Sequence, residues 1–255
     1  MDLGLPTTGL DRYKSASQRA RVGTESWGAE NFFCPACESP RLHSAPQGTA
    51  AIDYICPTCH SLFQLKSQSK ALGGRIVDAA YSEMKRAILE DRTPNLYILH
   101  YDLAAWAVRT LILIPRFAFA LSAVERRKPL ASTARRAGWV GCNIVLDRIP
   151  LGARISVIED GQSHSRAAVR DAYRRLRPLE ELRVEKRGWT LDVLRVVQSM
   201  NKTEFELADV YAHAEGLAKL HPGNRHVHDK IRQQLQVLRN LGHLEFLGGG
   251  NYRLV

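Results

Sequence analysis

DYICPTCHSLFQLKSQSK, residues 53–70, combines two cysteines with an acid, a glutamine and a lysine in one short stretch. Asp53 precedes the cysteine pair, and Gln64 and Lys66 follow it. The flanking segments AAIDYIC and SLFQLKS have the composition of short strands. We therefore predict a strand that ends at Asp53, a turn that carries the cysteines, and a second strand over residues 61–67.

The cysteines of this turn, Cys56 and Cys59, have a matching upstream pair, Cys34 and Cys37, in CPAC. Each C-x2-C pair places two thiolates on one side of a tight turn, and two pairs complete a tetrahedral four-sulfur shell. The alternatives are four unrelated thiols or a redox C-x-x-C, which normally lies beside a βαβ pattern that this segment lacks. We predict a closed, structural zinc site. Cys142 has no such partner in the sequence and is expected to be buried.

Gln64 and Lys66 lie two residues apart in the second strand, so their side chains share a face. If the two strands pair around the cysteine turn, Asp53 joins them there. Two oxygen ligands hold a hard cation such as Mg²⁺, which polarises a phosphate and lowers the pKa of its bound water. A lysine can position that water and stabilise charge in the transition state. The three residues therefore predict phosphodiester hydrolysis.

This constellation resembles the PD-(D/E)xK nuclease core, with Gln64 in place of the second acid, so the motif here is D-x10-Q-x-K. A glutamine carbonyl can ligate Mg²⁺ but adds no negative charge, and metal affinity is expected to fall. We include the backbone carbonyl of Leu65 as a further magnesium ligand. Glu25, in GTESW, is a candidate supporting carboxylate from an N-terminal helix; the alternative is an ordinary surface residue.

The whole chain has 255 residues and a formal net charge of +10, which favours a polyanionic partner, nucleic acid before anionic membrane. A solvated basic surface is the alternative. The apolar stretch 103–124 is interrupted by Arg109, Pro115 and Arg116, so we expect a strand there and no membrane span. With no secretory signal predicted, we expect unpaired cysteines and a reducing, bacterial cytoplasmic location.

The C-terminal residues show helical periodicity followed by a hairpin. Residues 187–200 and 224–242 each have one apolar stripe at helical spacing. Between them, Thr203 is predicted to cap a second helix, with Glu206 three residues on. Gly242 is a natural helix stop, and HLEFLGGGNYRLV (243–255) predicts two strands about a glycine turn. Three helices and a hairpin indicate a winged helix, whose third helix enters the major groove of DNA.

Two segments carry candidate DNA contacts. Glutamine reads adenine edges, and arginine reads guanine edges or phosphates, although a solvated helix face is the alternative for each residue. The candidates on the third helix are Lys230, Arg232, Gln233, Gln234, Gln236 and Arg239, with His228 also off the apolar stripe. The second segment, ERRKPLASTARRAGW (125–139), is expected to be a flexible cationic segment that neutralises phosphates.

The second segment contains Arg135 and Arg136 and ends at Trp139. An exposed indole could pack against adenine methyl groups as other apolar side chains do against the thymine methyl. The alternative is a core tryptophan beside Cys142.

Several blocks together resemble the DpnI family of methyl-directed restriction endonucleases. They are YKSASQRARVGTESW, FQLKS, ERRKPLASTARRAGWVGCNI, RGWTLDVL and KIRQQLQVLRNLGHLEFLGGGNYRLV. The resemblance implies cleavage of double-stranded DNA at GATC sites that carry N6-methyladenine, by a zinc-bearing nuclease domain and a winged helix that both sense the site. It assigns catalysis to Asp53, an acid at position 64 and Lys66, and it places the Trp139 side chain against the methylated adenines. Asp53 and Lys66 match, whereas Gln64 does not.

The sequence thus predicts an α/β restriction-endonuclease-like core with an embedded four-cysteine zinc knuckle, plus an α+β winged helix. We expect a nuclease domain over residues 1–183, a linker near 180–187, a winged-helix domain over 184–255, and a monomer. Two alternatives stay open. One is a methyl-adenine reader with weak or no nuclease activity because of Gln64. The other is a zinc-bearing transcription regulator, which leaves Asp53 and Lys66 unexplained.

Overall fold

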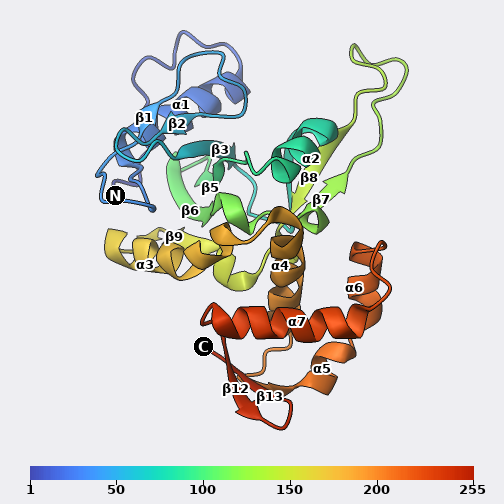
Figure 1. Cartoon of the computed structure of the whole chain (residues 1–255). Coiled ribbons are helices and arrows are strands. Elements are labelled where there is room, and N and C mark those ends of the chain that lie inside the picture. The colour runs from blue at the N-terminus through green and yellow to red at the C-terminus, as the bar shows by residue number, and fades with distance from the viewer. The chain divides into compact units, whose positions relative to one another are not determined.

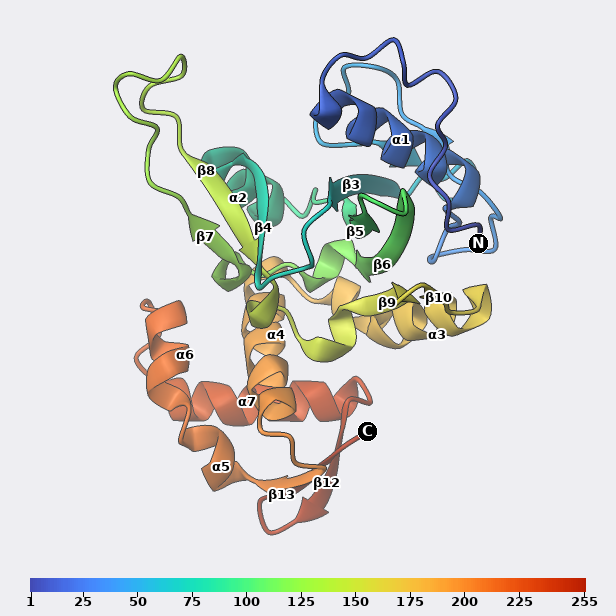
Figure 2. The same cartoon turned by 180° about the vertical axis from the view of Figure 1, so that it is seen from behind.

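The computed structural model describes residues 1–255 and divides them into two compact units (Figures 1 and 2). The first unit consists of Met1–Ile76, Thr93–Arg116 and Gly152–Leu176. The second unit consists of Val77–Arg92, Phe117–Leu151 and Arg177–Val255. These compact units interleave along the chain, whereas the predicted division at 183/184 is linear. That linear division stays a prediction.

The first unit is built on a seven-stranded sheet with the order β1-β2-β3-β5-β6-β9-β10. Only β3 and β5 pair in parallel; the other neighbours are antiparallel. β5 lies in the middle and is buried over most of its length, as expected for a strand covered on both faces. The strands are β1 (His43–Ser44), β2 (Tyr54–Ile55), β3 (Leu62–Gln68), β5 (Asn95–Asp102), β6 (Ala107–Ile114), β9 (Ile155–Glu159) and β10 (Gln162–Ser163).

Two helices complete the first unit, α1 (Ala16–Asn31) and α3 (Arg166–Leu176). Side-chain hydrogen bonds fix α1 against the sheet. Thr24 Oγ1 lies 3.0 Å from Ser67 Oγ on β3, and the Tyr54 hydroxyl on β2 donates to the Glu25 carbonyl at 2.7 Å. The helix is thereby held over the strands that flank the cysteine turn.

The second unit contains a three-stranded sheet in the order β4-β8-β7, with the helix α2 (Tyr81–Leu89). Its strands are β4 (Arg75–Ala80, of which residues from Val77 on belong to this unit), β7 (Val124–Arg126) and β8 (Gly141–Val145). Residues 127–140 join β7 to β8, and we call them the hairpin arm; Figure 1 shows this arm projecting from its sheet. Backbone bonds cross its base, from Arg127 N to the Gly141 carbonyl at 3.0 Å and from Leu130 N to the Trp139 carbonyl at 2.9 Å. The predicted cationic segment therefore forms a hairpin, and its flexibility stays a prediction.

The remainder of the second unit is the predicted winged helix. Its elements are α4 (Val184–Ser199), β11 (Glu204–Glu206), α5 (Leu207–Tyr211), α6 (Ala214–Leu220), α7 (Val227–Asn240), β12 (Leu244–Gly248) and β13 (Asn251–Leu254). The two predicted apolar stripes, on α4 and α7, meet in one buried core. After α7, Gly242 has φ +78°, and the N–H groups of Gly242 and His243 bond back to the Arg239 and Leu238 carbonyls. This Schellman motif confirms the predicted helix stop.

The predicted second helix of the winged helix is wrong in detail. Thr203 does not cap it; instead Glu204–Glu206 forms β11, because Phe205 is buried opposite Tyr252 of β13 while its neighbours face solvent. Glu206 then caps α5 in a reciprocal pair with Asp209, and the helix breaks before α6.

The predicted linker near residues 180–187 is also shorter in the structure, because α4 begins at Val184. Arg187 explains this, since its side chain is only 2% exposed and forms an ion pair with Asp91. Its guanidinium also donates to the Glu180 and Leu182 carbonyls. A buried arginine needs such partners, so this turn must be ordered.

The remaining short elements are five 3₁₀ helices, Arg116–Ala118, Leu121–Ala123, Leu146–Arg148, Leu151–Ala153 and Arg177–Glu181. The apolar stretch 103–124 forms β6 and the first two of them, as the interrupting residues predicted. None of the helices combines the length and the apolar character needed to span a bilayer.

The close approach of α1 to β2 at Gly28 gives a stability prediction. A Cβ built at Gly28 would collide with the Tyr54 hydroxyl and lie 2.7 Å from the Phe32 ring. We expect Gly28→Ala to lower the free energy of unfolding by about 1–3 kcal/mol, because the new methyl overpacks the interface. Urea denaturation measures this change. Gly216→Ala on α6 is the control, since nothing lies within 4 Å of its added Cβ; equal losses in both variants would contradict the packing argument.

Candidate active site and DNA-binding surfaces

Asp53 stands at an edge of β3 that β2 leaves uncovered. The β2–β3 pairing is short, and Asp53 N donates to the Phe63 carbonyl at 2.8 Å just before it. The next N–H of β3 that points toward this edge is that of Leu65. It donates to Asp53 Oδ2 at 2.7 Å instead of to a backbone carbonyl. Upstream, Ala51 has φ +58°, which ends any extended chain. The predicted strand ending at Asp53 is therefore wrong: Asp53 immediately precedes its strand.

The predicted catalytic residues line one concave site of about 240 Å³. Gln64 and Lys66 of β3 contribute half-buried side chains, and Asp53 lies beside them. The N–H and C=O of one strand residue point to the same edge, so the Leu65 carbonyl faces the edge that Asp53 occupies. The structure thus brings the proposed oxygen ligands and the lysine together. Their roles stay predictions.

Helix α1 supplies the opposite wall through Arg21, Thr24 and Glu25. Arg21 Nε and Glu25 Oε1 are 2.7 Å apart. The hydrogen bond to Glu25 and its charge raise the pKa of Arg21, and the charge of Asp53 adds to the increase. Burial raises the pKa of the Tyr54 hydroxyl, to which both carboxylates also contribute. Sequence reasoning named Glu25 but missed Arg21, although its i,i+4 spacing from Glu25 was a visible clue.

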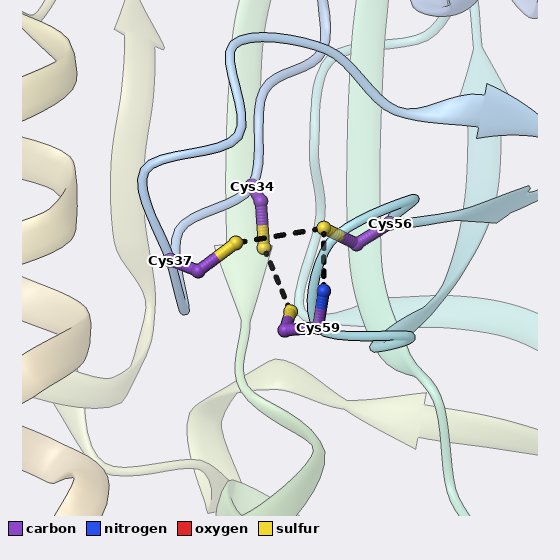
Figure 3. Close-up of side chains that lie close together, drawn as sticks. All are labelled: Cys34, Cys37, Cys56 and Cys59. Carbon is purple, nitrogen blue, oxygen red and sulfur yellow. Dashed lines mark hydrogen bonds between the residues drawn. The ribbon is translucent and has the colours of Figure 1, made fainter.

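The four predicted zinc ligands form a compact sulfur cluster (Figure 3). Cys34 and Cys59 sulfurs are 3.5 Å apart, as are those of Cys37 and Cys56, and all four lie within 4.8 Å of one another. A tetrahedral zinc ion with Zn–S bonds of about 2.3 Å requires sulfur separations of roughly 3.8 Å. The cluster can therefore bind zinc.

The pKa values of two of these thiols, Cys34 and Cys56, shift in opposite directions. Burial raises the pKa of the Cys34 thiol. Burial also opposes ionisation of Cys56, but backbone N–H groups of Cys59 and Thr58 donate to its sulfur and lower its pKa to about 6. The Cys59 N–H lies 3.4 Å from Cys56 Sγ (Figure 3). The backbone donors thus favour the Cys56 thiolate, the form that ligates a metal, whereas burial disfavours the Cys34 thiolate.

Arg170 of α3 fixes the cysteine loop, a role that the sequence did not suggest. Its guanidinium donates to the Cys34 carbonyl at 3.1 Å, to the Ser39 carbonyl at 3.2 Å and to Glu38 Oε2 at 2.6 Å. It also lies over the Phe33 ring, 5.5 Å from the centroid. One side chain therefore joins the loop to the helix.

Trp139 lies at the base of the hairpin arm and is half-buried. Its ring packs on Gly141, where an added Cβ would lie 2.7 Å away, and the Arg136 guanidinium stacks over it at 4.9 Å. Cys142 is fully buried and donates to the Ala79 carbonyl, whereas Trp139 keeps an accessible part. The core alternative for Trp139 does not fit this placement. Arg135 and Arg136 are both exposed.

Helix α7 exposes most of its candidate DNA contacts. Lys230 is half-buried, and the exposed ones are His228, Arg232, Gln233, Gln236 and Arg239. Gln234 is the exception: it is 0% exposed and accepts a hydrogen bond from Thr190 Oγ1 of α4 at 2.7 Å. The prediction that Gln234 contacts DNA is therefore wrong. Its position three residues after Ile231 and four before Leu238 places it on the buried stripe.

The fold and these surfaces define the class as a DNA-binding protein with an α/β unit and a winged helix. Comparison with known families agrees with that class. The DpnI model, described as the Dam-replacing family, matches residues 1–182, and the DpnI_C model, described as the Dam-replacing HTH domain, matches residues 185–254. The chain belongs to the DpnI family, which is a family of restriction endonucleases.

The cysteine cluster yields a prediction about metal and stability. We expect Cys56→Ser to lose bound zinc and to lower the unfolding temperature, because metal binding at such a site is coupled to folding. Zinc content and thermal unfolding measure the two effects. Cys142→Ala is the matched control, since Cys142 lies outside the cluster and should leave zinc content unchanged. A Cys56→Ser protein of normal stability without zinc would show that the cluster is not a structural site.

Proposed function

We propose that the protein is a methyl-directed type II restriction endonuclease that hydrolyses double-stranded DNA at GATC sites carrying N6-methyladenine. The observation that carries this proposal is the meeting of Asp53, Gln64 and Lys66 in one cavity at the open edge of β3. Membership of the DpnI family supports the restriction activity. The sequence resemblance supports the GATC and methyl specificity.

The residues of the cavity suit a PD-(D/E)xK type of chemistry with Mg²⁺. Asp53, the Gln64 amide oxygen and the Leu65 carbonyl would hold the cation, and all three are the hard oxygen donors that it prefers. The Leu65 N–H fixes Asp53 Oδ2 and so orients the carboxylate. When bound, Mg²⁺ supplies a polarised phosphate and a more acidic water. Lys66 would position the attacking water and stabilise negative charge on the phosphate.

DNA recognition in this proposal uses two surfaces of the second unit. Trp139 would contact the adenine methyl groups, and Arg135 and Arg136 would neutralise phosphates. Helix α7 would read the major groove. The residues proposed there are Lys230, Arg232, Gln233, Gln236 and Arg239. Zinc is the proposed structural cofactor, and we propose that the protein acts as a monomer in the bacterial cytoplasm.

One observation favours a second candidate function, a methyl-adenine reader that cuts weakly or not at all. Gln64 adds no charge to the cavity, whose two carboxylates, Asp53 and Glu25, are already balanced by Arg21 and Lys66. A divalent cation is then held by fewer charges than in a site with a second strand acid. Cleavage itself distinguishes the two candidates.

Digestion of one plasmid, prepared with and without adenine methylation at GATC, tests the function. We expect Mg²⁺-dependent cleavage of the methylated preparation only, since recognition requires the methyl groups. Gel electrophoresis gives the result, and EDTA is the control. Equal cutting of both preparations would rule out methyl-directed recognition. Binding of methylated DNA without cutting would favour the reader.

Gln64→Glu tests the ligand set. We expect the substitution to shift the Mg²⁺ midpoint of cleavage down on the order of tenfold, because a full charge is added next to the cation. Asp53→Ala should abolish cutting while DNA binding persists. Lys66→Ala should slow the chemical step by roughly 10²–10⁴-fold at saturating Mg²⁺. An unchanged midpoint for Gln64→Glu, together with an active Asp53→Ala, would place the active site elsewhere.

A further inference from the structure

We propose that Arg21 is a positioning residue that sets the magnesium requirement of the site, by holding Glu25 and neutralising the cavity until the cation binds. This inference rests on the proposed function of the cavity. Arg21 would act through Glu25 and through the net charge around Asp53, without touching the scissile phosphate.

The first step is geometric. Arg21 and Glu25 are four residues apart on α1, so they share a face, and both line the same cavity as Asp53. Their ion pair is 2.7 Å long. The helix that carries them is fixed by the Thr24–Ser67 and Tyr54–Glu25 hydrogen bonds. The pair is therefore aimed into the cavity by the fold.

The second step is the charge balance. The lining contains two carboxylates, Asp53 and Glu25, and two cations, Arg21 and Lys66, so its formal charge is zero. Gln64 is neutral, and nothing else in the lining attracts Mg²⁺ by charge. A binding cation must overcome the repulsion of both cationic side chains. Lys66 lies among the proposed ligands on β3, which leaves Arg21 as the charge that the proposed chemistry does not use.

The third step is the freedom of the two side chains to separate. The Arg21 side chain is 75% exposed, and that of Glu25 is 36% exposed. Arg21 can therefore rotate into solvent, while Glu25 stays at the cavity wall. The coupling energy of an exposed ion pair of this kind is small, so a divalent cation can compete with Arg21 for the Glu25 carboxylate. Arg21 would then turn into solvent when a cation occupies the site, and the Glu25 carboxylate would face that cation.

The test is Mg²⁺ binding to the zinc-loaded, DNA-free protein, measured by calorimetry at fixed ionic strength. We expect Arg21→Ala to bind Mg²⁺ about twofold to fivefold more tightly. This range corresponds to the coupling energy of an exposed ion pair. The Mg²⁺ midpoint of DNA cleavage should fall by the same factor. Arg19→Ala is the matched control, because Arg19 is an exposed arginine on the same helix outside the cavity. In a Glu25→Gln background, the effect of Arg21→Ala should shrink.

The outcomes separate this inference from the proposed function. If Asp53→Ala loses Mg²⁺ binding but Arg21→Ala binds with unchanged or lower affinity, the role of Arg21 is overturned and the magnesium site stands. An Arg19→Ala protein that gains as much affinity as Arg21→Ala would also overturn it, since the effect would then come from overall charge. If Asp53→Ala binds Mg²⁺ as the unmodified protein does, both the inference and the proposed site fail.

Discussion

The backbone N–H of Leu65 points to an edge of β3 that β2 leaves uncovered, and a donor in that position needs an acceptor. Asp53 supplies it through Oδ2, at 2.7 Å. One side chain thus replaces the backbone carbonyl of a longer strand. As a result the edge of β3 stays open beside Gln64 and Lys66, and the carboxylate that would hold a cation is oriented by the sheet itself. The cavity exists because the β2–β3 ladder stops where it does.

The cysteine cluster adjoins the three elements that meet at this edge, α1, β2 and β3. Helix α1 ends at Asn31, three residues before Cys34, so the first cysteine pair directly follows the helix that carries Glu25. Cys56 follows β2 directly, and Cys59 lies three residues before β3. A metal bound by all four sulfurs would therefore hold α1, on one side of the cavity, to β2 and β3 on the other side. Such a metal would explain why the second cysteine pair lies between Asp53 and Gln64 in the sequence.

Features that depend on local spacing could be predicted from the sequence, whereas those that depend on distant partners could not. The paired C-x2-C motifs, the apolar stripes of α4 and α7 and the stop at Gly242 are local, and the structure has them. The order of residues 180–187 depends on Asp91, more than ninety residues from Arg187 in the chain. Similarly, β11 forms only because β13 is present. The burial of Gln234 follows from its spacing along α7. Its hydrogen bond with Thr190 could not be predicted in this way, because Thr190 lies on another helix.

Within the second unit, one buried carboxylate of the winged helix, that of Asp192, also binds the segment that precedes β7. Asp192 of α4 is 0% exposed; it accepts from Ser122 Oγ at 2.7 Å, and His221 Nε2 lies 2.8 Å from its other oxygen. A buried carboxylate that lost either partner would carry a large desolvation cost. The segment that precedes β7 is therefore linked to the winged helix by the hydrogen-bonding needs of one side chain. Both surfaces proposed to read DNA, the arm with Trp139 and helix α7, thus belong to one compact unit, although they are about ninety residues apart in the chain.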